Sequence, residues 1–228
     1  LRERVLRDFP DNRIVILPQS IHFDSAQEQS RIAERLSAHR DVRIAARDRA
    51  SYDFARSVTP HAVLLPDTVH MLARPSQTEC REVVPRGTVY LLRRDAEMNR
   101  MRKPPQSPVD WPTIFPDYLP RLVAAAALMP IAPRSWSERL HDRWSRYAEE
   151  LLSRGFSWMT GVEHLVTDRL HAAILARLVE RPVTLLDTAS GKLTAYYGTW
   201  WYNDPAVTLA PRFPTAVEPL PRRASSRP

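Results

Sequence analysis

The 228-residue sequence contains one cysteine, two lysines and no long hydrophobic run. The single cysteine, Cys80, excludes an internal disulfide and is typical of a protein in a reducing compartment. The longest apolar stretch, residues 122–129, is much shorter than the ~20 residues that cross a membrane. No secretory signal sequence opens the chain. We therefore expect a cytoplasmic location.

Metal-site and nucleic-acid motifs are also missing from the sequence. The seven histidines show no spacing typical of metal ligands, so we expect neither a metal nor another cofactor. Arginines and aromatic residues do not interleave in a stripe, so nucleic acid is not an expected partner. The 33 basic residues include only the lysines Lys103 and Lys192. Such a bias toward arginine reflects genome composition, so most of the arginines need no functional explanation.

The positive charge has two parts with different meanings. The formal net charge is +7, and part of it lies in residues 211–228, which we expect to form a disordered basic tail. The remaining positive charge favours anionic ligands or an anionic membrane surface. Peripheral contact with the inner face of the membrane is therefore compatible with the sequence.

Apolar runs alternate with amphipathic segments along the chain, which predicts parallel β-sheets wound with α-helices. Strands are expected at residues 13–17, 42–46, 62–65, 88–92, 164–166 and 183–186. Helices are expected after Ser25 and at residues 49–56, 119–129, 136–151, 168–180 and 194–202. Ser25 and Glu28 predict a capping box, the stripe at 136–151 predicts a core-facing helix, and the proline-rich residues 101–120 predict a loop.

This order of elements predicts an α/β fold with two Rossmann-like lobes. Residues 1–85 form the expected amino-terminal lobe and residues 86–210 the carboxy-terminal lobe, joined by a linker at 75–85. The chain begins at Leu1 and reaches a strand almost at once, so we expect the first lobe to be incomplete, with its start missing.

The junction Thr167-Asp168-Arg169-Leu170-His171 lies between an expected strand and an expected helix. Open α/β sheets bind ligands at such positions, where backbone N–H groups and the helix dipole favour an anion. Arg169 offers a planar fork for a phosphate or carboxylate. His171 can transfer a proton near neutral pH, and Lys192, which follows Gly191, adds a compact positive charge.

Each candidate also has a structural interpretation. Arg169 could form an ion pair with Asp168, and His171 could pack inside the first turn of its helix. Lys192 could be an ordinary turn residue. Arg93 and Arg94 follow the strand at 88–92. Either could be solvated, and we expect only one of them to face the cleft.

Two further candidates follow the first strand. Gln19 and Ser20 could form hydrogen bonds with a ligand or could cap the next segment.

A series of short motifs, in order, resembles the polysaccharide pyruvyl transferase family, most closely its exopolysaccharide branch. The motifs are residues 15–21, 47–52, 65–67, 92–97, 110–111, 167–171 and 191–192 with 197–200. The likeness extends over nearly all of residues 13–200. The chain departs from the family's pattern at Ala172, where relatives often carry glycine, and it lacks the family's glycine-rich opening.

The resemblance implies a glycosyltransferase-B-like fold with the donor site in the carboxy-terminal lobe and the acceptor side in the amino-terminal lobe. It implies transfer of pyruvate from phosphoenolpyruvate to a sugar, with formation of a ketal. The implied partner is a cell-surface polysaccharide or its lipid-linked precursor. By position, it implies catalytic and donor-binding roles for Arg93, Arg169, Leu170, His171 and Lys192.

Two other functions remain open from the sequence. A nucleotide-sugar glycosyltransferase could share this architecture, because fold does not determine reaction. Such an enzyme usually grips the ribose with a carboxylate, and the second lobe offers no convincing candidate. A non-catalytic glycan-binding protein is the third interpretation.

Overall fold

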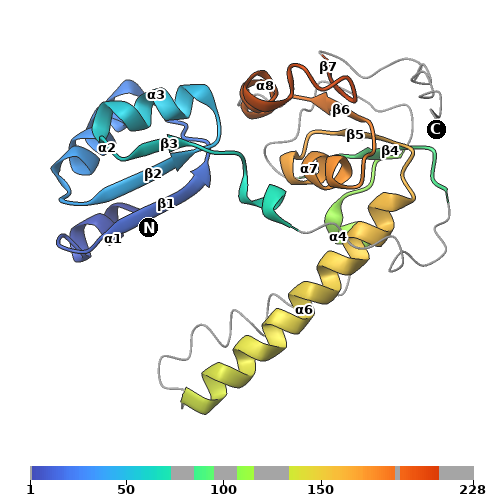
Figure 1. Cartoon of the computed structure of the whole chain (residues 1–228), viewed down its shortest axis with the longest axis horizontal. Coiled ribbons are helices and arrows are strands. Elements are labelled where there is room, and N and C mark those ends of the chain that lie inside the picture. Colours follow the sequence, from blue (N-terminus) through green and yellow to red (C-terminus); the bar gives the residue numbers. More distant parts are fainter. Residues whose placement is uncertain (1, 73–84, 95–106, 116–133, 188–190, 211–228) are drawn as a thin grey trace, which may run out of the picture. The chain divides into compact units, whose positions relative to one another are not determined.

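The computed structural model describes residues 2–72, 85–94, 107–115, 134–187 and 191–210 (Figure 1). The chain divides into two compact units. The first contains Leu1–Arg74 and Asp187–Leu209, and the second contains Pro75–Leu186 and Ala210–Pro228. Both units contain a parallel sheet, so the expected mixed α/β class is confirmed.

The first unit is built on three parallel strands, β1 (Ile14–Gln19), β2 (Val42–Ala46) and β3 (Ala62–Leu64), in that order. Helix α2 (Ala26–Ala38) connects β1 to β2, and α3 (Arg49–Val58) connects β2 to β3. Because both crossovers advance in one direction, the two helices lie on the same side of the sheet (Figure 1).

Local signals in the sequence explain where these helices begin. The Ser25 hydroxyl accepts the N–H of Glu28 at 3.1 Å, and the Glu28 carboxylate accepts the N–H of Asp24 at 3.0 Å. The predicted capping box is thus formed, although the returning bond reaches one residue before the cap. Asp48 caps α3 by accepting the N–H of Ser51 at 2.9 Å. Free backbone N–H groups in the first helical turns are satisfied in this way.

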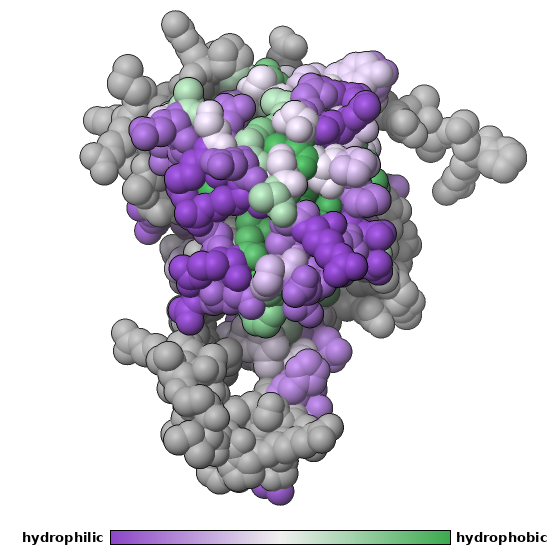
Figure 2. Space-filling model, turned by 90° about the vertical axis from the view of Figure 1, so that its left-hand side faces the viewer, coloured by the Kyte–Doolittle hydropathy of each residue, from purple (hydrophilic) through white to green (hydrophobic). Residues whose placement is uncertain are grey.

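The two faces of the first sheet differ in burial. Ile14 and Ile16 point toward the core formed by residues of β2, α2 and α3. The alternate side chains of the edge strands are exposed, at 58% for Val15, 67% for Leu17 and 47% for Val63. Apolar surface is also visible between hydrophilic side chains in Figure 2. Strand β1 therefore carries apolar residues on both faces, a pattern typical of the interior strands of parallel sheets.

The second unit contains strands β4 (Thr88–Leu91), β5 (His164–Thr167) and β6 (Val183–Leu186), paired in parallel. Helix α7 (Leu170–Leu178) connects β5 to β6, and residues 172–176 within it are buried. Every residue of β6 is buried, as expected of a strand that is covered on both faces. Ala210, the last residue of β7 (Val207–Ala210), packs against the core of this unit.

Two helical segments of the second unit differ from the sequence expectation. Helix α6 (Arg134–Thr160) includes the predicted 136–151 segment, but Trp144 is 43% exposed, so the expected core position of that residue is wrong. In Figure 1 the amino-terminal part of α6 extends away from β4–β6, which explains the exposure. Within the predicted proline-rich loop, Asp110 caps the short helix α4 (Trp111–Ile114).

The segment after β6 is grouped with the first unit. Helix α8 (Lys192–Tyr196) continues into a π-helical turn, η3 (Tyr197–Trp201). The Tyr196 hydroxyl accepts the N–H of Asp67 at 3.1 Å, and the Trp200 indole N–H donates to the Arg47 carbonyl at 2.8 Å. The boundaries of this division therefore differ from the expected lobes, because these contacts tie residues 187–209 to the first unit.

Other expectations fall on parts of the chain outside the description. The expected linker at 75–85, apart from residue 85, the expected helix at 119–129 and the expected disordered tail at 211–228 all lie outside the described residues.

Helix α1 (Arg2–Asp8) and the 3₁₀ turn η1 (Thr68–Met71) are described elements that were not expected from the sequence.

Candidate functional site

Two adjacent strand ends of the second unit are tied together by side chains of the Thr167–Asp168 junction. The Thr167 hydroxyl donates to the Leu91 carbonyl at 2.6 Å and accepts the N–H of Arg169 at 3.0 Å. The Asp168 carboxylate accepts the N–H of Arg93 at 2.9 Å. The backbones of Arg93 and Arg169 are therefore held together at the carboxyl edge of the sheet, as the sequence predicted for ligand-binding positions.

The guanidinium of Arg169 is paired with a carboxylate that lies 59 positions earlier in the chain. Arg169 Nη2 lies 2.7 Å from Asp110 Oδ2, and the two side chains are 21% and 5% exposed. The sequence alternative was a pair between Arg169 and its neighbour Asp168, but the carboxylate of Asp168 instead binds the Arg93 backbone. Asp110 was not among the predicted site residues, although it belongs to a motif of the family resemblance.

Burial affects the ionisation of Asp168. Burial raises the pKa of Asp168 above its ordinary value, while the Arg93 N–H and the positive charge of Arg169 act in the opposite direction. Asp168 as a whole is 6% exposed. Its hydrogen bond to the backbone of Arg93 therefore forms in a partly desolvated environment, where such bonds are strong.

Leu170 and His171 begin the helix that follows β5. Arg169 is the N-cap residue of α7 and makes no side-chain cap bond. Because α7 begins just after β5, the positive end of its helix dipole lies at the carboxyl end of β5. Leu170 is half-buried, whereas His171 is exposed and does not pack inside the first turn. Arg93 is half-buried and its neighbour Arg94 is exposed, with Nη2 of Arg94 donating to the Pro108 carbonyl at 2.9 Å.

Lys192 belongs to the first unit rather than to the group around Arg169. It is the first residue of α8, after Gly191 in the left-handed conformation with φ of 67°. The Asp187 carboxylate accepts the N–H groups of Leu193 at 3.2 Å and Thr194 at 2.9 Å, which fixes the start of α8. The structure thus holds Lys192 at a well-defined helix start.

Ser20 takes part in a polar network at the carboxyl edge of the first sheet. Its hydroxyl accepts Nε of Arg47 at 3.0 Å, and Nη1 of Arg47 lies 2.5 Å from the Asp67 carboxylate. Arg47 is 17% exposed as a side chain and Asp67 is 4% exposed. The backbone carbonyl of Gln19 accepts the N–H of Arg47 at 3.2 Å. Ser20 therefore has a structural partner, and a ligand-binding role for Gln19 and Ser20 stays a prediction.

The same network extends to an aromatic pair that sequence reasoning missed. His70 Nε2 lies 2.9 Å from the Tyr196 hydroxyl, whose ring packs edge-on against Trp201 with centroids 5.0 Å apart. Burial raises the pKa of Tyr196 to about 12 and lowers the pKa of His70. These residues lie 126 positions apart, so no local sequence signal could have paired them.

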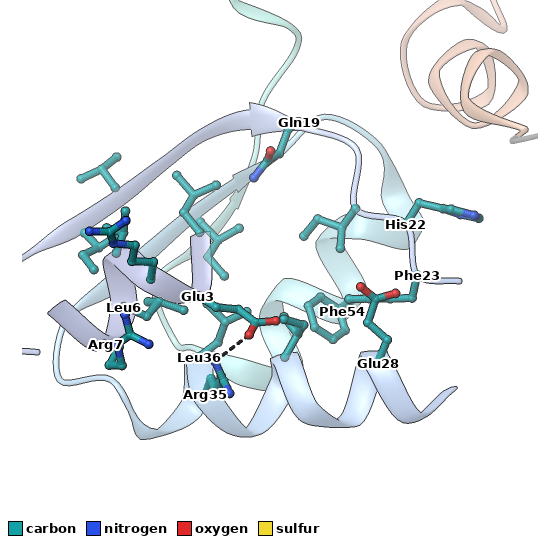
Figure 3. Close-up of a pocket in the computed structure, with 18 residues that line it drawn as sticks. Glu3, Leu6, Arg7, Gln19, His22, Phe23, Glu28, Arg35, Leu36 and Phe54 are labelled. Atoms are coloured by element: carbon teal, nitrogen blue, oxygen red, sulfur yellow. Dashed lines mark hydrogen bonds and ion pairs between the residues drawn. The ribbon is translucent and has the colours of Figure 1, made fainter. Parts of the chain in front are cut away.

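The first unit also contains a pocket of about 980 Å³ between α1, β1 and α2 (Figure 3). Its wall is mainly apolar and includes Leu6, Leu36 and Phe54. Gln19 lies beside the carboxyl end of β1, and the ion pair between Glu3 and Arg35 lies near the α1 side. The residues that line the pocket all belong to the first unit.

Among the residues that the structure describes, no group of three or more His, Cys, Asp or Glu side chains is placed to hold a metal ion. Within those ranges, no helix is both long and apolar enough to cross a membrane.

The second unit therefore defines a class of site. Arg93 and Arg169 follow the neighbouring parallel strands β4 and β5, and the exposed His171 is in the first turn of α7, so all three lie at the carboxyl edge of one sheet, where α/β proteins commonly bind ligands. The family model for polysaccharide pyruvyl transferases matches residues 1–190. The chain belongs to the polysaccharide pyruvyl transferase family, as the motifs predicted.

Several known proteins share this similarity. The chain is 29% identical over 216 residues to a Bacillus subtilis protein described as the pyruvyl transferase EpsO, covering 91% of this chain and 66% of that protein. It is 28% identical over 223 residues to pyruvyl transferase 1 of Schizosaccharomyces pombe, covering 89% of this chain and 50% of that protein. The chain therefore spans between half and two thirds of the length of these relatives.

A solved structure gives independent support for the fold. A protein of uncharacterised function from Klebsiella pneumoniae, KP1_0663, superposes with a TM-score of 0.53 at 17% sequence identity. The match covers 87% of this chain and 63% of that chain. At this level of identity the likeness concerns the fold alone.

Proposed function

We propose that the protein transfers pyruvate from phosphoenolpyruvate to a sugar of a polysaccharide or its lipid-linked precursor, and that the product is a cyclic pyruvate ketal. The observation that carries the proposal is that the Arg93 N–H is bound by Asp168 and the Arg169 N–H by Thr167, which fixes both arginine backbones at the carboxyl edge of one sheet. Membership of the pyruvyl transferase family supports the transferred group and the saccharide acceptor. The glycosyltransferase-B-like arrangement is part of this proposal.

Phosphoenolpyruvate presents two anionic groups on a three-carbon frame. A phosphate and a carboxylate so close together require clustered cations with directional N–H groups. Arg93 and Arg169 supply guanidinium forks suited to both groups, and the start of α7 adds a favourable dipole. Leu170 would contact the carbon frame, and Lys192 would contribute further positive charge.

The reaction can be written with its atoms balanced. A proton is added to the methylene carbon, and a sugar hydroxyl oxygen attacks the adjacent carbon as it loses its own proton. A second hydroxyl then forms the other carbon–oxygen bond, the bond to phosphate breaks, and that hydroxyl's proton leaves with the phosphate. His171 is the proposed general acid and base, and Arg169 stabilises charge on the reacting donor.

The remaining roles follow from the same scheme. Gln19 and Ser20 are proposed to contact the acceptor from the first unit. The chemistry uses phosphoenolpyruvate as a substrate and calls for no cofactor. The net charge of +7 supports work at the anionic inner face of the membrane, in the cytoplasm, on a lipid-linked acceptor.

Phosphorus NMR tests the proposal directly. The protein is mixed with phosphoenolpyruvate and candidate glycans, and we expect the donor signal to be replaced by inorganic phosphate only when an acceptor is present. Consumption of a nucleotide sugar instead would favour a glycosyltransferase. Inactivity with both donors, in the presence of the native glycan, would favour a non-catalytic glycan-binding protein.

The role of His171 has its own test. His171→Asn should lower kcat by ~10²–10⁴-fold, the usual contribution of acid–base catalysis, with little change in donor affinity. Because the side chain is exposed, we expect the substituted protein to fold normally, and its melting temperature checks this. Near-normal turnover by His171→Asn would remove His171 from the mechanism.

A further inference from the structure

Asp110 performs two tasks with its two carboxylate oxygens. Oδ1 accepts the N–H of Trp111 at 2.7 Å and caps α4, while Oδ2 accepts Nη2 of Arg169 at 2.7 Å. The residue is 4% exposed, so both bonds form out of contact with bulk water. Only the first task is needed to start a helix.

The backbone around Asp110 is attached to the same sheet as Arg169. The N–H of Val109 donates to the Tyr90 carbonyl, and the N–H of Leu92 donates to the Val109 carbonyl, both at 2.9 Å. On the other side, the N–H of Thr113 donates to the Asp110 carbonyl at 2.8 Å. The carboxylate is therefore held on a fixed backbone rather than on a loosely attached loop.

We propose that Asp110 is a positioning residue for donor binding, because it fixes the plane of the Arg169 guanidinium at the carboxyl edge of the second sheet. This inference rests on the proposed function of Arg169. A guanidinium has five N–H donors in one plane, so a strong bond at one Nη nitrogen restricts the direction of the others. The Asp110 carboxylate also offsets the positive charge of Arg169. It therefore weakens the long-range attraction of an anionic donor while it sets the orientation of the guanidinium.

The substitution Asp110→Asn separates these tasks. Asparagine caps helices about as well as aspartate, so α4 should keep its start. The charge-assisted bond to Arg169 is lost, and we expect the Kd for phosphoenolpyruvate, measured by calorimetry, to rise by about tenfold. Asp48→Asn is the matched control, because Asp48 is also buried and also caps a helix, in its case α3.

In a protein that lacks the Arg169 guanidinium, Asp110→Asn should have the opposite effect on donor affinity. In an Arg169→Met protein the carboxylate of Asp110 has lost the guanidinium partner and repels the dianionic donor, so adding Asp110→Asn should tighten binding rather than weaken it. A merely structural Asp110 would weaken binding to a similar extent in both backgrounds. That result, or unchanged donor affinity in Asp110→Asn, would overturn the inference.

NMR of the arginine side chains keeps this test independent of the proposed function. The Arg169 Nη signals, assigned by their loss in Arg169→Lys, should show hindered rotation in the unmodified protein and free rotation in Asp110→Asn. Hindered rotation with no binding of phosphoenolpyruvate by the unmodified protein would reject the proposed donor site, and with it the donor role of Asp110. Free rotation in the unmodified protein would reject the positioning contact itself.

Discussion

At the residue scale, the most informative side chain of the second unit is a threonine. Thr167 joins β4 to β5 by donating to the Leu91 carbonyl, and it orders the next residue by accepting the Arg169 N–H. Its hydroxyl is fully buried. The threonine of the family motif thus holds a backbone arrangement beside Arg169 and His171, for which catalytic roles are proposed.

Removal of the Thr167 hydroxyl should destabilise the folded protein. Thr167→Val keeps the side-chain shape but leaves the Arg169 N–H and the Leu91 carbonyl without this partner, so we expect a loss of about 1–3 kcal/mol in the free energy of unfolding. Urea unfolding measures the change. Thr113→Val, at an exposed position, is the control and should change stability by less than about 0.5 kcal/mol. Equal effects of the two substitutions would contradict this account.

Two histidines give the protein a predictable response to acid. Burial lowers the pKa of His70 and of His164 from the value of 6.5, and His164 Nε2 lies 2.8 Å from the Thr184 hydroxyl. Below that value the unfolded chain takes up more protons than the folded protein. The free energy of unfolding should therefore fall as the pH drops below 6.5 toward the lowered values.

Urea unfolding at several pH values measures this slope. His70→Asn and His164→Asn should each make the stability less dependent on pH in the acidic range. If the free energy of unfolding depends on pH as strongly in both His70→Asn and His164→Asn, groups other than these histidines cause the dependence.

At the element scale, the strands and main helices were predictable because their signals are local. Apolar runs marked β1 to β6, and Ser25 with Glu28 marked the start of α2. Pairings across the chain were not predictable in the same way. The Asp110–Arg169 and His70–Tyr196 contacts depend on which strand ends and helices come together, and no spacing along the sequence encodes that.

The capping box offers a test at this scale. Ser25→Ala removes the acceptor for the Glu28 N–H at the start of α2, and we expect a loss of about 1 kcal/mol in the free energy of unfolding. Ser25→Asp should restore most of the stability, since aspartate caps equally well. Circular dichroism during urea unfolding measures both, and an unchanged midpoint for Ser25→Ala would show that the cap is dispensable.

At the scale of the whole molecule, the two units are not consecutive pieces of sequence. The first unit takes in residues 187–209, which follow β6 in the chain. The expected lobes, 1–85 and 86–210, were separated at the linker and stay a prediction. The assignment of residues 187–209 to the first unit depends instead on contacts of Tyr196 and Trp200 with Asp67 and Arg47, which are distant in the sequence.

This organisation predicts the behaviour of fragments. Residues 1–74 alone should be less stable than residues 1–74 joined to 187–209 by a flexible linker, because only the joined chain restores the buried Tyr196 beside His70. Thermal melting followed by near-ultraviolet circular dichroism compares the two. Equal melting temperatures would mean that the returning segment adds nothing to the first unit.

The returning segment also sets a rule for hybrid enzymes. If the first unit were exchanged between two family members to transplant acceptor preference, a crossover confined to residue 74 would leave Tyr196 and Trp200 of one parent facing Asp67 and Arg47 of the other. A second crossover pair around residues 187–209 avoids that mismatch. Lys192 would then be exchanged together with the first unit, so a changed donor affinity in such a hybrid would report on the donor role proposed for Lys192.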